Sequence, residues 1–268
     1  MIAAARPAAG SAAASLGPAT ILDDLEAGRI RAAEPDPAAP GGWRVRPEVK
    51  SAILALFADP TPASWQVGPF VYRDRAAFLP IDPGTGRRIV PGGSAIRAGA
   101  HLEPGVVVMP PSYVNVGAWI GADTMVDSHV LVGSCAQIGA GVHLAAGVTI
   151  GGVLEPPGAR PVIVEDGAFV GAGSRLLDGV LVGHGAVIGA GVILTGTSRL
   201  YDLVDECERH GTVDEPLVVP PDVVVVPGSR TLAGPWAEER GLSVSTAMIV
   251  KRRDAGTAAR VALEDALR

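Results

Sequence analysis

Aliphatic residues recur at every sixth position through the middle of this chain, and this spacing limits the fold more than any other feature. A period of six suits neither an α-helix, which repeats about every 3.6 residues, nor a simple strand, whose side chains alternate. It suits a chain that coils into a three-sided prism, a parallel β-helix with one hexad on each side. The repeat consists of Ile96, Leu102, Val108, Val114, Ile120, Val126, Val132, Ile138, Leu144 and Ile150, and resumes after an interruption with Val164, Val170, Leu176, Val182, Ile188 and Leu194.

Two further hexad positions show a preference. The residue four places after each repeat position is mostly small or β-branched, as at Ala100, Thr124 and Val142, and we expect it to face inward. The residue directly after each repeat position is often glycine, as at Gly121 and Gly139. We expect it to form the corners of the coil, because glycine accepts backbone angles that other residues avoid. The remaining positions are predicted to face outward, so we expect chemistry there.

The composition excludes several classes of protein. A length of 268 residues suits one main domain with appendages, and 4% aromatic residues suit a narrow coil filled with small aliphatic side chains. A net charge of −6 argues against nucleic acid as a partner, which needs a basic surface. Two cysteines are too few for a disulfide framework. With no signal peptide and no apolar run of membrane length, we expect a cytoplasmic protein without a membrane partner.

The pattern divides the chain into four segments. Residues 1–18 are predicted to be a disordered tail. Residues 19–93 are predicted to be a helical or α+β region, with helices over 19–33 and 47–57. The prism is expected over 94–230, interrupted by loops at 154–163 and 197–217. Residues 231–268 are predicted to form a closing strand and an amphipathic helix that covers the open end.

Four short motifs are far more specific than the hexad repeat: PSYVN, TMVD, GSCAQIG and GGVLEP, between Pro111 and Pro156. In these motifs the chain resembles the tetrahydrodipicolinate N-succinyltransferases, hexapeptide-repeat acyltransferases of lysine and diaminopimelate synthesis. The likeness covers about residues 20–268 and is loose only in the N-terminal third. The resemblance implies a left-handed parallel β-helix and a homotrimer with active sites in the grooves between subunits. It also implies succinyl-CoA as the donor, an amine on a small carboxylate as the acceptor, and no metal.

The resemblance marks Asp127, the last residue of TMVD, as the first member of the family's acidic pair. An aliphatic amine is largely protonated at neutral pH, and a nearby carboxylate can orient it and accept a proton during attack on a thioester. The alternative is a corner aspartate that bonds its own backbone. His129 stands where the family has tryptophan, and is either a second candidate base or a filler of the same space.

Two departures from the family pattern concern the acceptor. Arg175 occupies the position of the family's second acid, and Gly173 replaces the arginine usual two residues earlier. Arg175 is predicted either to hold a substrate carboxylate through a bidentate fork or to be a solvated surface residue. Ser174 and Gly151 are predicted to line the same substrate site.

For CoA, we expect the pantetheine arm to lie along the corners that hold Ala172, Gly173, Ala190 and Gly191, with a backbone N–H as the oxyanion donor. The candidates for the phosphates are Arg199, Lys251 and Arg252. The histidines lack the spacing of zinc ligands, so no metal site is predicted. Cys135 has no evident activating neighbour and is expected to pack at the trimer interface.

The sequence therefore predicts a trimeric, CoA-dependent N-acyltransferase that moves a succinyl group to the amine or hydrazine-type nitrogen of a small carboxylate. The changes at Gly173 and Arg175 favour a relative used in specialised metabolism. The alternatives are the family's own tetrahydrodipicolinate reaction and a catalytically inactive trimeric scaffold.

Overall fold

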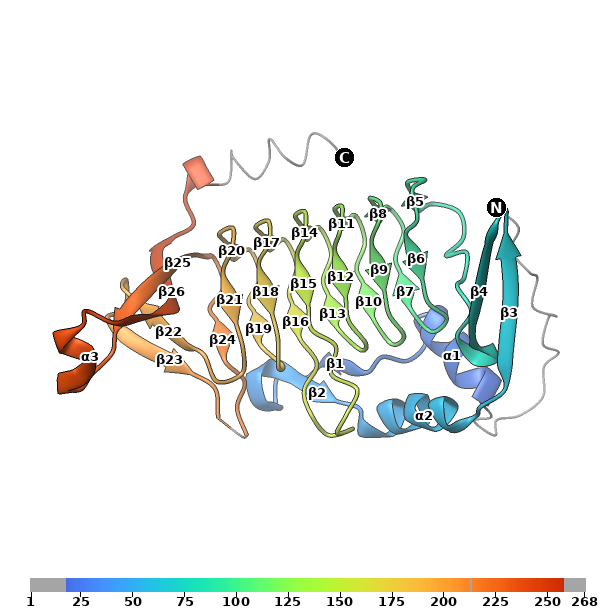
Figure 1. The fold of residues 1–268 in the computed structure, drawn as a ribbon, viewed down its shortest axis with the longest axis horizontal. Helices are drawn as coiled ribbons and strands as arrows, with labels where there is room; N and C mark the ends of the chain where they lie inside the picture. Colours follow the sequence, from blue (N-terminus) through green and yellow to red (C-terminus); the bar gives the residue numbers. More distant parts are fainter. Residues whose placement is uncertain (1–17, 213, 258–268) are drawn as a thin grey trace.

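The computed structural model describes residues 18–212 and 214–257, and its centre is a left-handed parallel β-helix (Figure 1). Each coil contributes three strands of two residues, and each strand pairs in parallel with the equivalent strands of the coils before and after it. Trp119, for example, is in register with His101 and Gln137. This offset of three hexads confirms the predicted fold class.

The prism has three faces. We name each face after the first residue of one of its strands, and the three residues chosen, Tyr113, Trp119 and Met125, belong to the same coil. The Tyr113 face contains β6 (Ala95–Ile96), β9 (Tyr113–Val114), β12 (Leu131–Val132), β15 (Thr149–Ile150), β18 (Arg175–Leu176) and β21 (Ile193–Leu194). The Trp119 face contains β7 (His101–Leu102), β10 (Trp119–Ile120), β13 (Gln137–Ile138), β16 (Ile163–Val164), β19 (Leu181–Val182) and β24 (Val218–Val219). The Met125 face contains β5 (Arg88–Ile89), β8 (Val107–Val108), β11 (Met125–Val126), β14 (His143–Leu144), β17 (Phe169–Val170), β20 (Val187–Ile188) and β25 (Val223–Thr231).

The core of the prism is the stack of repeat residues, and the side chains four places later complete it. Both sets are buried, as expected. The polar members of the second set donate to a carbonyl oxygen fifteen residues later: Ser112 Oγ to Asp127 O at 2.8 Å, Thr124 Oγ1 to Gly139 O at 2.8 Å, and Ser174 Oγ to Gly189 O at 2.9 Å. Hydroxyls are therefore tolerated inside because the backbone supplies their acceptors.

The corner glycines have a different role from the one predicted. The left-handed backbone conformation falls three places after the repeat residue, as at Gly147 (φ 71°) and Gly173 (φ 70°). The glycine directly after the repeat residue is needed because the coils approach closely: a Cβ on Gly121 would lie 2.4 Å from the carbonyl carbon of Gly139. The expectation that this first glycine supplies the unusual backbone angles was wrong.

Two helices cover the edge between the Tyr113 and Trp119 faces: α1 (Pro18–Glu26) and α2 (Pro47–Ala58). Their apolar side chains pack on Val116 and Cys135 at the corners of that edge. The predicted helix over 47–57 is confirmed. The helix predicted over 19–33 ends at Glu26, because Gly28 takes a φ of +70°, a conformation common just after helix ends.

The rest of the N-terminal region connects these helices to the coil. The strands β1 (Ala33–Pro35) and β2 (Trp43–Val45) form an antiparallel ribbon around the 3₁₀ turn at Pro40–Gly42. After α2 come the hairpin of β3 (Pro62–Val67) and β4 (Phe70–Arg75) and a second 3₁₀ turn at Ala76–Phe78. The first strand of the coil, β5, lies before residue 94, where the prism was expected to begin.

Residues next to this ribbon cover the Trp119 face. The Arg31 guanidinium carbon lies 4.0 Å from the centre of the Trp119 ring, and Arg31 Nε donates to Gln137 Oε1 at 2.9 Å. Trp43 Nε1 donates to Glu165 Oε1 at 2.9 Å. Burial lowers the pKa of Arg31 to about 10, although nearby carboxylates partly oppose this shift. The N-terminal segment is thus fastened to the prism by polar as well as apolar contacts.

The loop between β15 and β16 contains the predicted insertion and lies beside α2 (Figure 1). Lys50 of α2 is fully buried, and its Nζ donates to Ala159 O at 2.6 Å and to Pro156 O at 3.4 Å. Burial lowers the pKa of Lys50. This amine therefore holds the loop to the helix.

The C-terminal end extends the sheet of the Met125 face. The hairpin of β22 (Arg199–Asp202) and β23 (Cys207–His210) occupies the second predicted loop, and β26 (Ser243–Arg252), the expected closing strand, lies between β22 and β25. The short helix α3 (Pro235–Glu239) joins β25 to β26. The predicted C-terminal helix lies mostly outside the described residues, as does the predicted tail. Within the described part, no helix has the length and apolar character needed to cross a membrane.

Candidate active site

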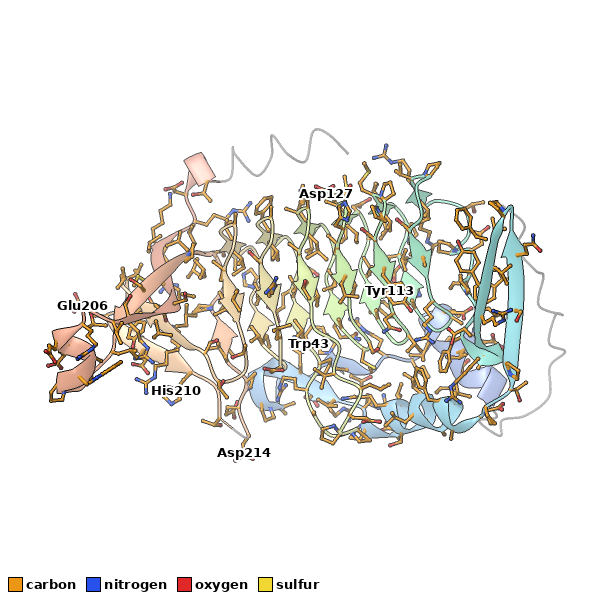
Figure 2. The ribbon with its side chains drawn as sticks, viewed as in Figure 1. Trp43, Tyr113, Asp127, Glu206, His210 and Asp214 are labelled. Atoms are coloured by element: carbon orange, nitrogen blue, oxygen red, sulfur yellow. The ribbon has the colours of Figure 1, made fainter. Side chains whose placement is uncertain are left out.

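Asp127 lies at the edge where the Met125 face meets the Tyr113 face, directly after β11 (Figure 2). Its backbone is fixed by the coil, because its N–H donates to Leu144 O at 2.9 Å. Its half-buried side chain accepts a hydrogen bond from the N–H of Ser128, at 2.6 Å from Oδ1. Asp127 therefore makes the backbone contact that the structural alternative predicted, and its other carboxylate oxygen, Oδ2, makes no hydrogen bond with the described residues.

His129 occupies the left-handed position of the same corner, with φ 61° and an exposed side chain. Glycine takes this position in the coils that follow, at Gly147, Gly173 and Gly191. No hydrogen bond joins the side chains of His129 and Asp127 among the described residues. The histidine is accessible for proton transfer with a bound reactant, but the structure does not show it aligned by the aspartate.

Four of the predicted CoA-binding residues, Ala172, Gly173, Ala190 and Gly191, lie on the same edge, which we call the Asp127 edge. The corners of the following coils continue in a column below Ser128, since Gly147 N donates to Ser128 O, Gly173 N to Ala146 O, and Gly191 N to Ala172 O. Ala172, Gly173, Ala190 and Gly191 are all exposed, and no atom lies within 4 Å of a Cβ built on Gly173 or Gly191. A long, narrow ligand therefore finds a smooth track along this edge.

The column also contains backbone donors that sequence reasoning did not locate. The N–H groups of Gly147, Gly173 and Gly191 are used between coils, so they are not oxyanion donors. The N–H groups of Ala146, Ala172 and Ala190 have no acceptor among the described residues. At the edge between the Trp119 and Met125 faces, the equivalent N–H of Ala140 points outward and donates to Asp166 Oδ1 at 2.8 Å. Three amides spaced by one coil, about 4.8 Å apart, are thus available to a ligand.

The three predicted substrate residues do not meet in one chain. Arg175 is exposed on the Tyr113 face, two coils beyond Leu131, with no ion pair among the described residues. Ser174 is fully buried and its hydroxyl points into the prism, so the prediction that it lines a substrate site was wrong. Gly151 lies at a different edge, where a Cβ would be 3.0 Å from Leu177 Cδ2.

The three predicted phosphate-binding cations each face a carboxylate. Arg199 Nη1 lies 3.3 Å from Glu208 Oε1, Lys251 Nζ lies 2.6 Å from Asp254 Oδ2, and Arg252 Nη2 lies 2.8 Å from Asp205 Oδ1. The hydrogen bond from Lys251 is the main reason that the pKa of Asp254 is lowered. These pairs compete with any anion that approaches. Arg230 was not among the predicted residues; it is half-buried, lines the same pocket as Arg199 and has no such partner in the described region.

Cys135 and His143 have structural roles. Cys135 is fully buried against α2 inside one chain, so the expected location at a trimer interface was wrong. Burial raises the pKa of its thiol to about 12, which leaves it protonated and unreactive at neutral pH. His143 is buried on the Met125 face with its ring centre 5.0 Å from that of Phe169. No group of three His, Cys, Asp or Glu residues suited to a metal exists within the described ranges.

Comparison with known proteins identifies the family. Residues 117–152 match the model of the bacterial transferase hexapeptide, and residues 161–196 match the hexapeptide repeat of succinyl-transferase. The 2,3,4,5-tetrahydropyridine-2,6-dicarboxylate N-succinyltransferase of Xylella fastidiosa strain Temecula1 is 40% identical over 254 residues, which cover 92% of this chain and 86% of the relative. The chain belongs to this N-succinyltransferase family.

A second member, from Bordetella petrii, is 40% identical over 250 residues, covering 91% of this chain and 86% of the relative. The predicted family is therefore confirmed, and the protein is an N-acyltransferase.

Proposed function

We propose that this N-succinyltransferase family member catalyses the reaction after which its relatives are named, the transfer of a succinyl group from succinyl-CoA to 2,3,4,5-tetrahydropyridine-2,6-dicarboxylate. The observation that carries the proposal is the TMVD aspartate, Asp127, placed on an open edge in a chain 40% identical to such enzymes. These relatives favour the family's own reaction over the specialised-metabolite function that the sequence suggested.

Asp127 supplies the proton acceptor in this mechanism. The ring nitrogen of the acceptor is an imine without a hydrogen, so water first adds to its C=N bond and opens the ring to a primary amine and a ketone. The amine attacks the carbonyl carbon of the thioester, and the free Oδ2 of Asp127 accepts the proton that the nitrogen loses as it forms the amide. The carbon–sulfur bond breaks, and the CoA thiolate takes up this proton and leaves as the thiol. A positioned general base of this kind contributes about 10²- to 10⁴-fold to the rate. The bond from Ser128 N–H to Oδ1 keeps the carboxylate in place.

The outward amides of the Asp127 edge fit the donor. Pantetheine carries two amide groups in a row, and the N–H groups of Ala146, Ala172 and Ala190 offer donors at regular spacing along the coil axis. An amide near Asp127 is also suited to stabilise the oxyanion that forms when the thioester is attacked. Succinyl-CoA is thus a co-substrate that lies along the edge, with its sulfur nearest Asp127.

The Tyr113 face supports assembly into a trimer. On this face Tyr113, Leu131 and Ile193 are 37%, 38% and 51% exposed. Exposed apolar side chains on one sheet, two of them on the adjacent strands β9 and β12, suit burial against another copy of the chain. Such an assembly places a neighbouring subunit beside the Asp127 edge, which borders this face.

Arg175 favours a second candidate function, transfer to a different acceptor. It is an exposed cation without an ion-pair partner among the described residues, at the position of a family acid. An acceptor with an additional or displaced carboxylate fits this change.

A turnover assay tests both functions. Purified protein is mixed with succinyl-CoA and either tetrahydropyridine-2,6-dicarboxylate or a panel of amino and hydrazino carboxylates, and free thiol is followed over time. Rapid release with the first acceptor supports the family's own reaction. Release only with another acceptor supports the second candidate, and absence of release with every acceptor contradicts both.

A further inference from the structure

A groove of about 660 Å³ follows the edge between the Trp119 and Met125 faces, and none of the predicted site residues lines it. Arg31 and Trp43 of the N-terminal segment form one of its walls (Figure 2). In a three-sided prism this edge is opposite the Tyr113 face, so a trimer formed through that face leaves the groove open. Its volume is within the range of about 300–1,000 Å³ that is typical of small-molecule sites.

The guanidinium of Arg31 is held in the groove with unused donors. Its central carbon lies 4.0 Å from the ring centre of Trp119 and 5.5 Å from that of Trp43, so it is in contact with both indoles. Its Nε donates to Gln137 Oε1 at 2.9 Å, while Nη1 and Nη2 have no acceptor among the residues that the structure describes. A half-buried guanidinium fixed in this way offers a planar fork of donors, which matches a carboxylate.

Two carboxylates mark the ends of the groove floor. Glu103 follows β7 directly and Glu165 follows β16 directly, and these strands are three coils apart on the same face. At the spacing of parallel strands this separation is about 14 Å. Gly121 and Gly139 occupy the equivalent corners between the two acids and add no side chain to the floor. A ligand with a positive charge at each end of a chain therefore fits along it.

The charges of the groove are unequal. Glu103, Glu165 and the exposed Asp166 bring three carboxylates against the single guanidinium of Arg31. The carboxylate of Glu165 is fixed by neutral donors, because it accepts hydrogen bonds from the indole N–H of β2 at 2.9 Å and from the backbone N–H of His184 at 3.1 Å. A ligand with one carboxylate and two ammonium groups complements this distribution better than a simple anion or a simple zwitterion.

We propose that this groove binds a free basic amino acid, with its carboxylate on Arg31 and its two ammonium groups directed towards Glu103 and Glu165. A neutral amino acid brings only one ammonium group, and a diamine leaves the guanidinium without an anion. The inference does not depend on the proposed transferase reaction, because the groove and the Asp127 edge are different edges of the prism.

Calorimetric titration with L-lysine, L-norleucine and cadaverine tests the proposal. Norleucine lacks the side-chain ammonium group of lysine, and cadaverine lacks its carboxylate. The wild type is expected to bind lysine about 10- to 100-fold more tightly than either analogue, the effect of one or two charge-assisted hydrogen bonds.

Two variants locate the ligand. Arg31→Lys keeps the charge but loses the fork, and Glu103→Gln removes one negative charge but keeps an oxygen for His101 Nε2, which lies 3.1 Å away in the structure. Each is expected to bind lysine about 10-fold more weakly than the wild type. The matched control is Arg29→Lys, because Arg29 Nε donates to Asp24 Oδ1 at 2.7 Å and its side chain does not line the groove. This control is expected to keep the wild-type affinity.

Thermal unfolding of the ligand-free variants shows whether each is folded, and Glu103→Gln alone decides the location if Arg31→Lys does not fold. The proposal is overturned if lysine does not bind the wild type, or if norleucine or cadaverine binds as tightly as lysine. Unchanged affinity for lysine in Glu103→Gln also overturns it, because the ligand would then lie outside the groove.

Discussion

Replacement of Asp127 by asparagine separates the catalytic role of this residue from its structural role. Asparagine keeps an oxygen at the Oδ1 position, so it can still accept the hydrogen bond from Ser128 N–H that measures 2.6 Å in the structure. It cannot accept a proton from the reacting nitrogen. The change therefore removes one function and leaves the corner geometry intact.

The expected changes in kcat and in the free energy of unfolding follow from these two roles of Asp127. Loss of the general base should lower kcat about 10²- to 10⁴-fold, equivalent to about 3–5 kcal/mol of barrier. Because the side chain is half-buried and keeps its backbone bond, the free energy of unfolding should change by less than about 0.5 kcal/mol.

Asp166→Asn is the matched control. Asp166 is a corner aspartate at another edge, and its Oδ1 also accepts an outward backbone N–H, from Ala140 at 2.8 Å. Thiol release with saturating succinyl-CoA should fall sharply in Asp127→Asn and stay within about twofold of wild type in Asp166→Asn, a difference far below that of a lost general base. Equal rates in Asp127→Asn and the wild type would refute the assignment of Asp127 as the base.

Three further predictions concern assembly and stability. Leu131→Glu places a carboxylate on the Tyr113 face and should convert trimers to monomers in analytical ultracentrifugation; an unchanged trimer would show that this face is not the interface. Lys50→Met removes the donor to Ala159 O and should lower the free energy of unfolding in urea by about 1–3 kcal/mol, with no loss if the loop contact is unimportant. Burial raises the pKa of the Cys135 thiol from 9.0 to about 12. The contribution of the neutral thiol to the free energy of unfolding is therefore complete below pH 9 and is lost as the pH rises towards 12. Cys135→Ala should therefore lose stability less steeply above pH 9 than the wild type in urea titrations, and identical slopes would contradict the burial of a neutral thiol.

The hexad repeat was sufficient to predict the prism, because a side chain that must face inward at every sixth residue leaves one way to coil. The same logic predicted the inward position four residues later, where Ser112 and Thr124 find carbonyl acceptors. The assignment of Ser174 to the substrate site did not come from the repeat, in which that residue occupies the same inward position. The repeat itself would have corrected this assignment.

Contacts between distant segments could not be read from the sequence. Nothing in the spacing shows that Lys50 reaches the loop at Ala159, or that Arg230 and Thr246 line one pocket. Likewise, the sequence places Lys251 and Arg252 among the cations for CoA, but their pairing with Asp254 and Asp205 depends on how β26 lies against its neighbours. Side-chain availability is a property of the tertiary structure.

A crystal structure with bound CoA tests the central claim most directly, because it shows which edge of the prism holds the donor. We predict the sulfur beside Asp127 and the pantetheine carbonyls within hydrogen-bond reach of the Ala172 and Ala190 N–H groups. Density for CoA at another edge, such as the groove of about 660 Å³ beside Trp43 and Trp119, would contradict it.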